Sequence, residues 1–106
     1  MNTGAMRHLM KLEKPTQNRE SSGGIKQYYE PVTDIRAEIN QLSGRALEAA
    51  QAIKSEVTVR LKVRYRADMK DNMRLIYDNQ IYQVQYMIDP TMRKSELHVY
   101  CSISPL

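Results

Sequence analysis

The strongest pattern in the chain is a regular alternation of apolar and polar residues from Glu56 to Arg66. Successive side chains of a β-strand point to opposite faces, so this alternation predicts a strand with one face on a core. The other face would meet water or a partner. The apolar face comprises Val57, Val59, Leu61, Val63 and Tyr65, and the polar face comprises Thr58, Arg60, Lys62, Arg64 and Arg66.

Shorter segments with the same two-residue period predict further strands. Proline cannot donate to a β-ladder, so Pro15 and Pro31 are expected to end the two strands that precede them. The polar stretch 16–24, which closes on Ser-Ser-Gly-Gly, predicts a flexible loop, and Asp78 and Asn79 predict a tight hairpin turn. The predicted strands span residues 6–14, 25–30, 34–41, 73–77, 80–88 and 96–103.

The period changes once, in an alanine-rich segment that predicts a short helix over residues 43–53. Ser43 is expected to cap the N-terminus of this helix, with Leu42 and Leu47 forming a hydrophobic staple. A narrow apolar stripe follows the helix through Ala46, Leu47, Ala50 and Ile53.

These elements predict a mainly β fold. The length of 106 residues is usual for one domain, and 42% apolar with 26% charged residues is typical of a folded protein. Short strands joined by short turns leave little room for a layered α/β fold. The expected architecture is a single domain over residues 1–106, a small antiparallel β-barrel of about six to seven strands with one short α-helix inserted between two strands.

Residues that commonly carry enzyme chemistry are scarce. The chain has one cysteine, Cys101, and two histidines, His8 and His98, which are too few soft ligands for a structural zinc site. Cys101 is predicted to be a buried apolar residue, and neither histidine has an obvious catalytic partner in the sequence. We therefore expect no catalytic activity, no metal and no cofactor. Turn chemistry explains the aspartates of the predicted loops, namely Asp68, Asp71, Asp78 and Asp89.

The sequence also predicts neither export nor membrane insertion. No run of about 18 apolar residues occurs, and Arg7, Lys11 and Glu13 interrupt the N-terminal apolar residues. A single cysteine suits a reducing cytoplasm. We expect a protein without a membrane partner.

Four basic residues stand two apart on the polar face of the 56–66 strand, and we call them the basic ladder: Arg60, Lys62, Arg64 and Arg66. Alternate residues of a strand lie about 6.5–7 Å apart, so this row could follow a phosphate backbone or an acidic partner surface. The alternative is a solvated outer face whose charges pair with neighbouring carboxylates. The net charge of +4 permits a nucleic-acid partner without requiring one. Positions in the wall and rim of a barrel are a simpler explanation than base stacking for four tyrosines, namely Tyr77, Tyr82, Tyr86 and Tyr100.

Several short segments along residues 4–101 carry a family resemblance through their order and spacing. They are Gly4 with Met6-Arg7-His8 before Pro15, Gly23-Gly24 before Tyr29, Leu42-Ser43-Gly44-Arg45 with Ala49-Ala50, Val63-Arg64-Tyr65-Arg66, Met73-Arg74, Ile81-Tyr82-Gln83-Val84, and Asp89-Pro90 with Arg93 before Cys101. In this order they resemble the phage head-tail joining proteins, also called head-closure or stopper proteins.

The resemblance implies a structural subunit of a tailed-phage connector without enzymatic activity. Such a subunit self-associates into a ring, with a dodecamer as the expected assembly, and is compatible with a monomer in isolation. The ring would lie below the portal and adaptor proteins, close the DNA channel after packaging, and offer the tail proteins an attachment surface. Its location would be the virion, assembled in the cytoplasm of a bacterial host.

The resemblance also suggests roles for individual basic residues. The segment Leu42–Ser55 is expected to face the lumen of the ring, where Arg45 and Lys54 would approach the genomic DNA. Two alternatives remain open, a tail terminator or other tail-completion β-barrel, and a small nucleic-acid-binding barrel. Contacts with other subunits or partners are expected at Arg60, Lys62, Arg64, Arg66, Arg74 and Arg93.

Overall fold

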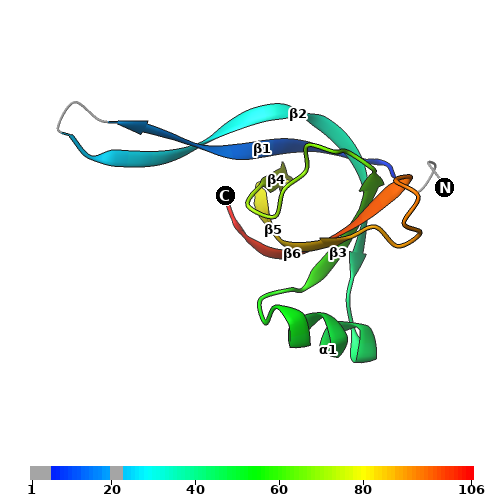
Figure 1. Ribbon diagram of the computed structural model, residues 1–106. Helices are drawn as coiled ribbons and strands as arrows, with labels where there is room; N and C mark the ends of the chain where they lie inside the picture. Colours follow the sequence, from blue (N-terminus) through cyan, green and yellow to red (C-terminus); the bar gives the residue numbers. More distant parts are fainter. Residues whose placement is uncertain (1–5, 20–22) are drawn as a thin grey trace.

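The strands of the protein close into an antiparallel β-barrel in the order β1-β2-β3-β6-β5-β4 (Figure 1). The computed structural model describes residues 6–19 and 23–106. The predicted fold class, a small antiparallel barrel with one inserted helix, is confirmed. In chain order the elements are β1 (His8–Arg19), β2 (Ile25–Gln41), α1 (Gly44–Ile53), β3 (Val59–Arg64), β4 (Arg74–Tyr77), β5 (Gln80–Ile88) and β6 (Glu96–Pro105).

The barrel interior is filled by alternate residues of every strand. In β3 the residues Val59, Leu61 and Val63 are buried, as the alternation predicts, and Leu97, Val99 and Cys101 oppose them from β6. The loop between β3 and β4 adds two methionines to the core. The buried core cluster comprises Met10, Leu12, Ile35, Ala37, Val59, Leu61, Val63, Met69, Met73, Leu75, Tyr82, Val84, Leu97, Val99 and Cys101.

The first two strands are longer than predicted and leave the barrel together as a two-stranded arm (Figure 1). β1 runs through Pro15, and β2 runs through Pro31, so the predicted strands 25–30 and 34–41 are one strand. The prediction that the two prolines end strands is therefore wrong. Each strand of a two-stranded ribbon has an open edge, where the missing N–H of a proline costs no ladder hydrogen bond.

The predicted loop over residues 16–24 is wrong for its first part, because residues 16–19 pair with residues 25–28. Residues 20–22 lie outside the described residues. The register between the two strands shifts between Leu12 and Glu13, whose partners are Thr33 and Pro31, so Val32 is an extra residue in β2. A bulge of this kind bends a ribbon and increases its twist, and here it marks the point where the arm leaves the barrel.

The turn between β4 and β5 is confirmed as a tight hairpin. Asp78 and Asn79 both adopt left-handed backbone angles, with φ of 51° and 60°. Two consecutive residues with positive φ are typical of a type I′ turn, whose twist matches that of the flanking strands.

Helix α1 lies outside the barrel wall, between β2 and β3 (Figure 1). Ser43 occupies the predicted N-cap position, although its side chain makes no capping hydrogen bond. Ala50 is the only buried residue of the helix. We call the segment Leu42–Thr58, which leaves the barrel wall and returns to it, the excursion. Its base is fixed to the barrel, because Leu42 N–H donates to Thr58 O at 3.2 Å. Within the part of the chain that the structure describes, no helix is both long and apolar enough to span a membrane.

Candidate interaction surfaces

The first two residues of the basic ladder, Arg60 and Lys62, lie on the outer wall of the barrel, where β2, β3 and β6 run side by side. Arg60 stands between Asn40 and Tyr100, and Lys62 stands between Glu38 and His98. The carboxylate of Glu38 therefore lies on the strand next to Lys62. Among the described residues, however, Arg66 is the one ladder residue that forms an ion pair, with Asp68 at 2.9 Å.

The outer wall beside Arg60 is aromatic. The rings of Tyr86 and Tyr100 stack with their centroids 4.4 Å apart and their planes 8° from parallel. One face of each ring is therefore covered by the other ring, which fits a wall position better than a site for stacking bases. Burial raises the pKa of Tyr86, with the neighbouring Tyr100 adding to the shift. Nε of Arg60 is buried without a hydrogen-bond partner.

His98 completes this wall, and its surroundings favour its neutral form. Desolvation lowers the pKa of His98, and the positive charge of Arg60 lowers it further, while Glu96 opposes the shift. His98 Nε2 lies 3.6 Å from the carboxylate of Glu96. The histidine is thus part of a packed outer surface with the cations Arg60 and Lys62 as neighbours.

The last two residues of the ladder, Arg64 and Arg66, line a hollow of about 370 Å³. We call it the arginine hollow. It lies where the β2–β3 ladder ends at Ala37 and Val63, while β3 stays paired with β6 to Arg64 and Tyr65 N–H donates to Ser95 O at 3.2 Å. Its apolar lining consists of Met6, Ile35 and Tyr65, and its cationic lining consists of Arg36, Arg64 and Arg66.

The three arginines of the hollow differ in their freedom. Arg66 is held by both oxygens of Asp68, through Nε at 3.0 Å and Nη2 at 2.9 Å. This hydrogen bonding lowers the pKa of the Asp68 carboxyl, although burial acts against it. Arg36 and Arg64 are exposed, and neither has a carboxylate within ion-pair distance among the described residues.

Sequence reasoning did not select Arg36 as a candidate binding residue and did not predict the hollow. In the sequence Arg36 stands on the polar side of an ordinary alternating segment, like many solvated residues. The hollow depends on where two strands separate, and no short-range pattern reports that separation.

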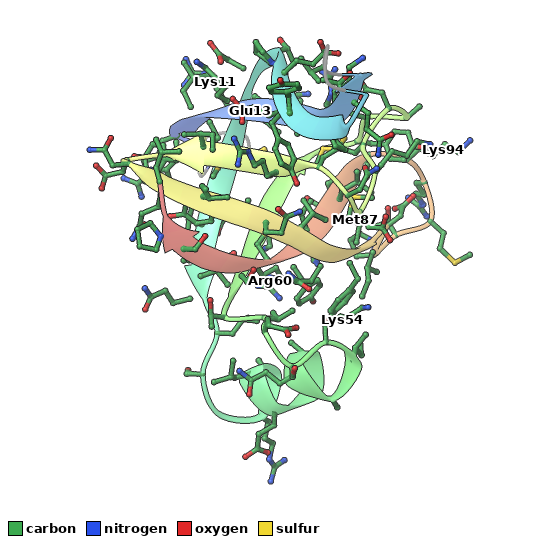
Figure 2. The ribbon with its side chains drawn as sticks, turned by 90° about the vertical axis from the view of Figure 1, so that its left-hand side faces the viewer. Lys11, Glu13, Lys54, Arg60, Met87 and Lys94 are labelled. Atoms are coloured by element: carbon green, nitrogen blue, oxygen red, sulfur yellow. The ribbon has the colours of Figure 1, made fainter. Side chains whose placement is uncertain are left out.

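The two basic residues assigned to the lumen, Arg45 and Lys54, are both exposed, at opposite ends of α1. A rise of 1.5 Å per residue separates their positions by roughly 13 Å along the helix axis. Figure 2 places Lys54 next to the helix and Arg60 above it on the barrel wall. The structure therefore spreads these positive charges along the excursion and does not gather them into one site.

The last two predicted contact residues differ in exposure. Nε of Arg74 donates to Glu13 Oε1 at 2.8 Å, and its guanidinium lies 3.9 Å from the centre of the Tyr29 ring. Arg74 thus binds the arm to β4. Arg93 is exposed in the loop between β5 and β6, next to Met92, whose side chain is 88% exposed.

The residues considered for enzyme chemistry, Cys101, His8 and Asp89, lie in the core or form hydrogen bonds within the fold. Cys101 is fully buried, as predicted, and burial raises its pKa far above the usual range of a thiol. His8 Nδ1 lies 2.8 Å from the hydroxyl of Tyr77. Asp89 accepts a hydrogen bond from Lys94 N–H inside its own loop, as turn chemistry predicts. The described residues contain no group of three histidine, cysteine, aspartate or glutamate side chains arranged to hold a metal ion.

Comparison with known proteins gives a family model and several similar solved structures. A family model described as phage head completion protein matches residues 1–104. No curated protein matches the chain. The solution structure of protein SF1141 from Shigella flexneri 2a is similar with a TM-score of 0.77 and 23% identity, over 96% of each chain. A chain in the virion of a native gene transfer agent particle is similar with a TM-score of 0.61 and 15% identity, over 94% of each chain.

Proposed function

The chain belongs to the phage head completion protein family, and from this premise we propose that it forms a ring below the portal and adaptor proteins of a tailed-phage connector. As a member of the family it is a structural protein of the phage particle. In the proposed role the ring, a dodecamer when assembled, closes the DNA channel after packaging. The same ring then gives the tail its attachment surface.

The observation that supports the closing role is the placement of α1 outside a barrel that is complete without it. The pair Gln41 and Val59 ends the β2–β3 ladder immediately before the excursion. Ile53 is 59% exposed and Ala50 alone is buried, so few contacts oppose a movement of the helix. An element with few buried contacts can change position while the framework stays fixed.

The same segment offers two cations to DNA. Arg45 and Lys54 are exposed, and with Glu48 as its acidic residue the segment Leu42–Ser55 has a net charge of +1. In a ring, each subunit would bring two such cations toward the phosphates in the channel. Counterion release favours this contact, and its strength depends on salt.

The first experiment is electron microscopy of particles produced without this protein. The proposal predicts heads that lose their DNA beside complete but unattached tails. Normal virions would contradict it. Filled, stable heads beside tails without a defined end would support the tail-terminator alternative.

The second experiment tests the lumen assignment with the double variant Arg45→Gln and Lys54→Gln. The matched control is Lys11→Gln with Lys70→Gln, which removes the same charge from exposed positions on the barrel. We expect the first variant to reduce the nuclease-protected DNA in filled heads and the control to leave it unchanged. Equal protection in both variants would contradict the lumen assignment.

A further inference from the structure

We infer that the arginine hollow binds an extended acidic segment of a partner protein, one that carries an apolar residue between two carboxylates. The floor of the hollow is apolar, with Met6, Ile35 and Tyr65, so its occupant needs an apolar side chain. The rim provides the free guanidiniums of Arg36 and Arg64. Guanidinium groups bind carboxylates through paired hydrogen bonds, which makes an acidic partner the best complement.

The backbone next to the hollow can receive such a segment. β2 pairs with β3 only from Ala37 to Gln41, so before Ala37 the edge of β2 that faces away from β1 has no strand partner among the described residues. Successive backbone N–H groups of a strand point to opposite edges, so alternate residues from Val32 to Arg36 direct theirs to this open edge, while Pro31 has none. An extended peptide could therefore add to β2 over these residues by main-chain hydrogen bonds.

The alternation of the two strands determines the pattern of the bound segment. Ile35 points into the barrel and Arg36 points outward, and β3 repeats this with Val63 inward and Arg64 exposed. A strand added between them would direct one side chain into the hollow and its two sequence neighbours outward, toward Arg36 and Arg64. The recognised pattern is thus acidic–apolar–acidic in three consecutive residues.

Nucleic acid is a poorer complement for this surface. The basic ladder does not present one continuous row of free cations, because Arg66 is bound to Asp68. Glu38 lies opposite Lys62, outside the hollow. This carboxylate repels a phosphate backbone that follows the wall, whereas a short peptide meets only the hollow and its rim.

The binding test uses peptides of defined sequence and the full chain, labelled with nitrogen-15. The probe is the capped peptide Thr-Glu-Leu-Glu-Thr, and the controls are Thr-Gln-Leu-Gln-Thr, which lacks the charges, and Thr-Glu-Ser-Glu-Thr, which lacks the apolar group. We expect the probe to shift the amide signals of Ile35, Arg36, Arg64 and Tyr65 at millimolar or lower concentration. Each control should bind at least about tenfold more weakly.

Charge reversal provides the matched protein variants. Arg36→Glu with Arg64→Glu should abolish binding of the probe and accept the reversed peptide Thr-Lys-Leu-Lys-Thr. The control Lys62→Glu changes an outward residue of the same strand outside the hollow and should leave the affinity within about twofold. Rescue by the reversed peptide would separate recognition from damage to the fold.

Three outcomes would overturn the inference. They are no signal shift with the probe at several millimolar, the same shifts with a short DNA duplex but not with the probe, and concentration-dependent self-association through Arg36 and Arg64. If the segment belongs to an adjoining connector protein, the inference rests on the proposed function. The peptide experiment is independent of that function. Normal virions without this protein would contradict the connector role and leave the peptide result unchanged.

Discussion

Two ion pairs at the base of the β1–β2 arm differ in burial, and this difference predicts very different contributions to stability. Arg74 and Glu13 have side chains 22% and 13% exposed, with 2.8 Å between Nε and Oε1. Lys14 and Glu30 lie one position further along the arm, with side chains 54% and 49% exposed and 3.4 Å between the charged atoms. The exposed pair of Lys14 and Glu30 is thus a control for the less exposed pair of Arg74 and Glu13.

The perturbation is Arg74→Met, which keeps most of the aliphatic stem and removes the charge. Removing one partner of a fully buried pair costs about 3–5 kcal/mol, and removing one partner of an exposed pair costs about 0–1 kcal/mol. Because Arg74 and Glu13 keep limited contact with water, we expect a loss of about 2 kcal/mol. This figure includes the contact of Arg74 with the Tyr29 ring, at 3.9 Å.

The assay is urea unfolding followed by far-ultraviolet circular dichroism, together with thermal unfolding. For a chain of this size, about 2 kcal/mol corresponds to a decrease in Tm of roughly 8–16 °C. The control Lys14→Met should change the free energy of unfolding by less than about 0.5 kcal/mol. Equal losses for the two variants would refute the reasoning, because burial would then not determine the cost.

Three further predictions test the core, the turn and the outer wall. Leu61→Ala, at a fully buried position of β3, should lower the free energy of unfolding by about 3–4 kcal/mol in urea denaturation, and a loss below about 1 kcal/mol would contradict a closed, well-packed core. Asn79→Gly should raise Tm slightly, because glycine adopts the φ of 60° at this position without the steric cost of a side chain; a lower Tm would argue against the type I′ turn. The pKa of His98 in the folded protein lies below its ordinary value of 6.5. At a pH between the folded and the unfolded pKa, the unfolded chain binds more protons than the folded protein. The free energy of unfolding should therefore fall as the pH decreases from 6.5 to the folded pKa. In His98→Gln this part of the pH dependence should be absent, and the same slope in both proteins would assign it to other groups.

The candidate surfaces were predictable only in part. The outward direction of Arg60 and Lys62 follows from the alternation of β3, and the register places both on the outer wall. Their neighbours could not be predicted, because Glu38 and His98 come from strands far away in the sequence. Arg74 was predicted as a contact residue, yet its partner Glu13 is 61 positions away and occupies it within the same chain.

Local pattern was sufficient for features whose cause is local. The two-residue period of residues 56–66 placed Val59, Leu61 and Val63 in the core, since a strand exposes alternate residues to opposite faces whatever its neighbours are. The strand itself is shorter than predicted, Val59–Arg64, and Tyr65 beyond it is half-buried. The pair Asp78-Asn79 determined the hairpin, since few residues tolerate positive φ. Cys101 was predicted as buried from the alternation of its own strand, and it is.

Tertiary structure decided what depends on partners across the chain. Whether Pro15 and Pro31 end a strand depends on which edges are open, and only the pairing of β1 with β2 shows that the ribbon continues into an arm. The arginine hollow arises where β2 separates from β3 beyond Ala37 and Val63, so that residues distant in sequence line one space. Sequence by itself determined the faces of the strands, and only the closed barrel determined which faces meet, because register and strand divergence are properties of pairs of strands and not of either strand alone.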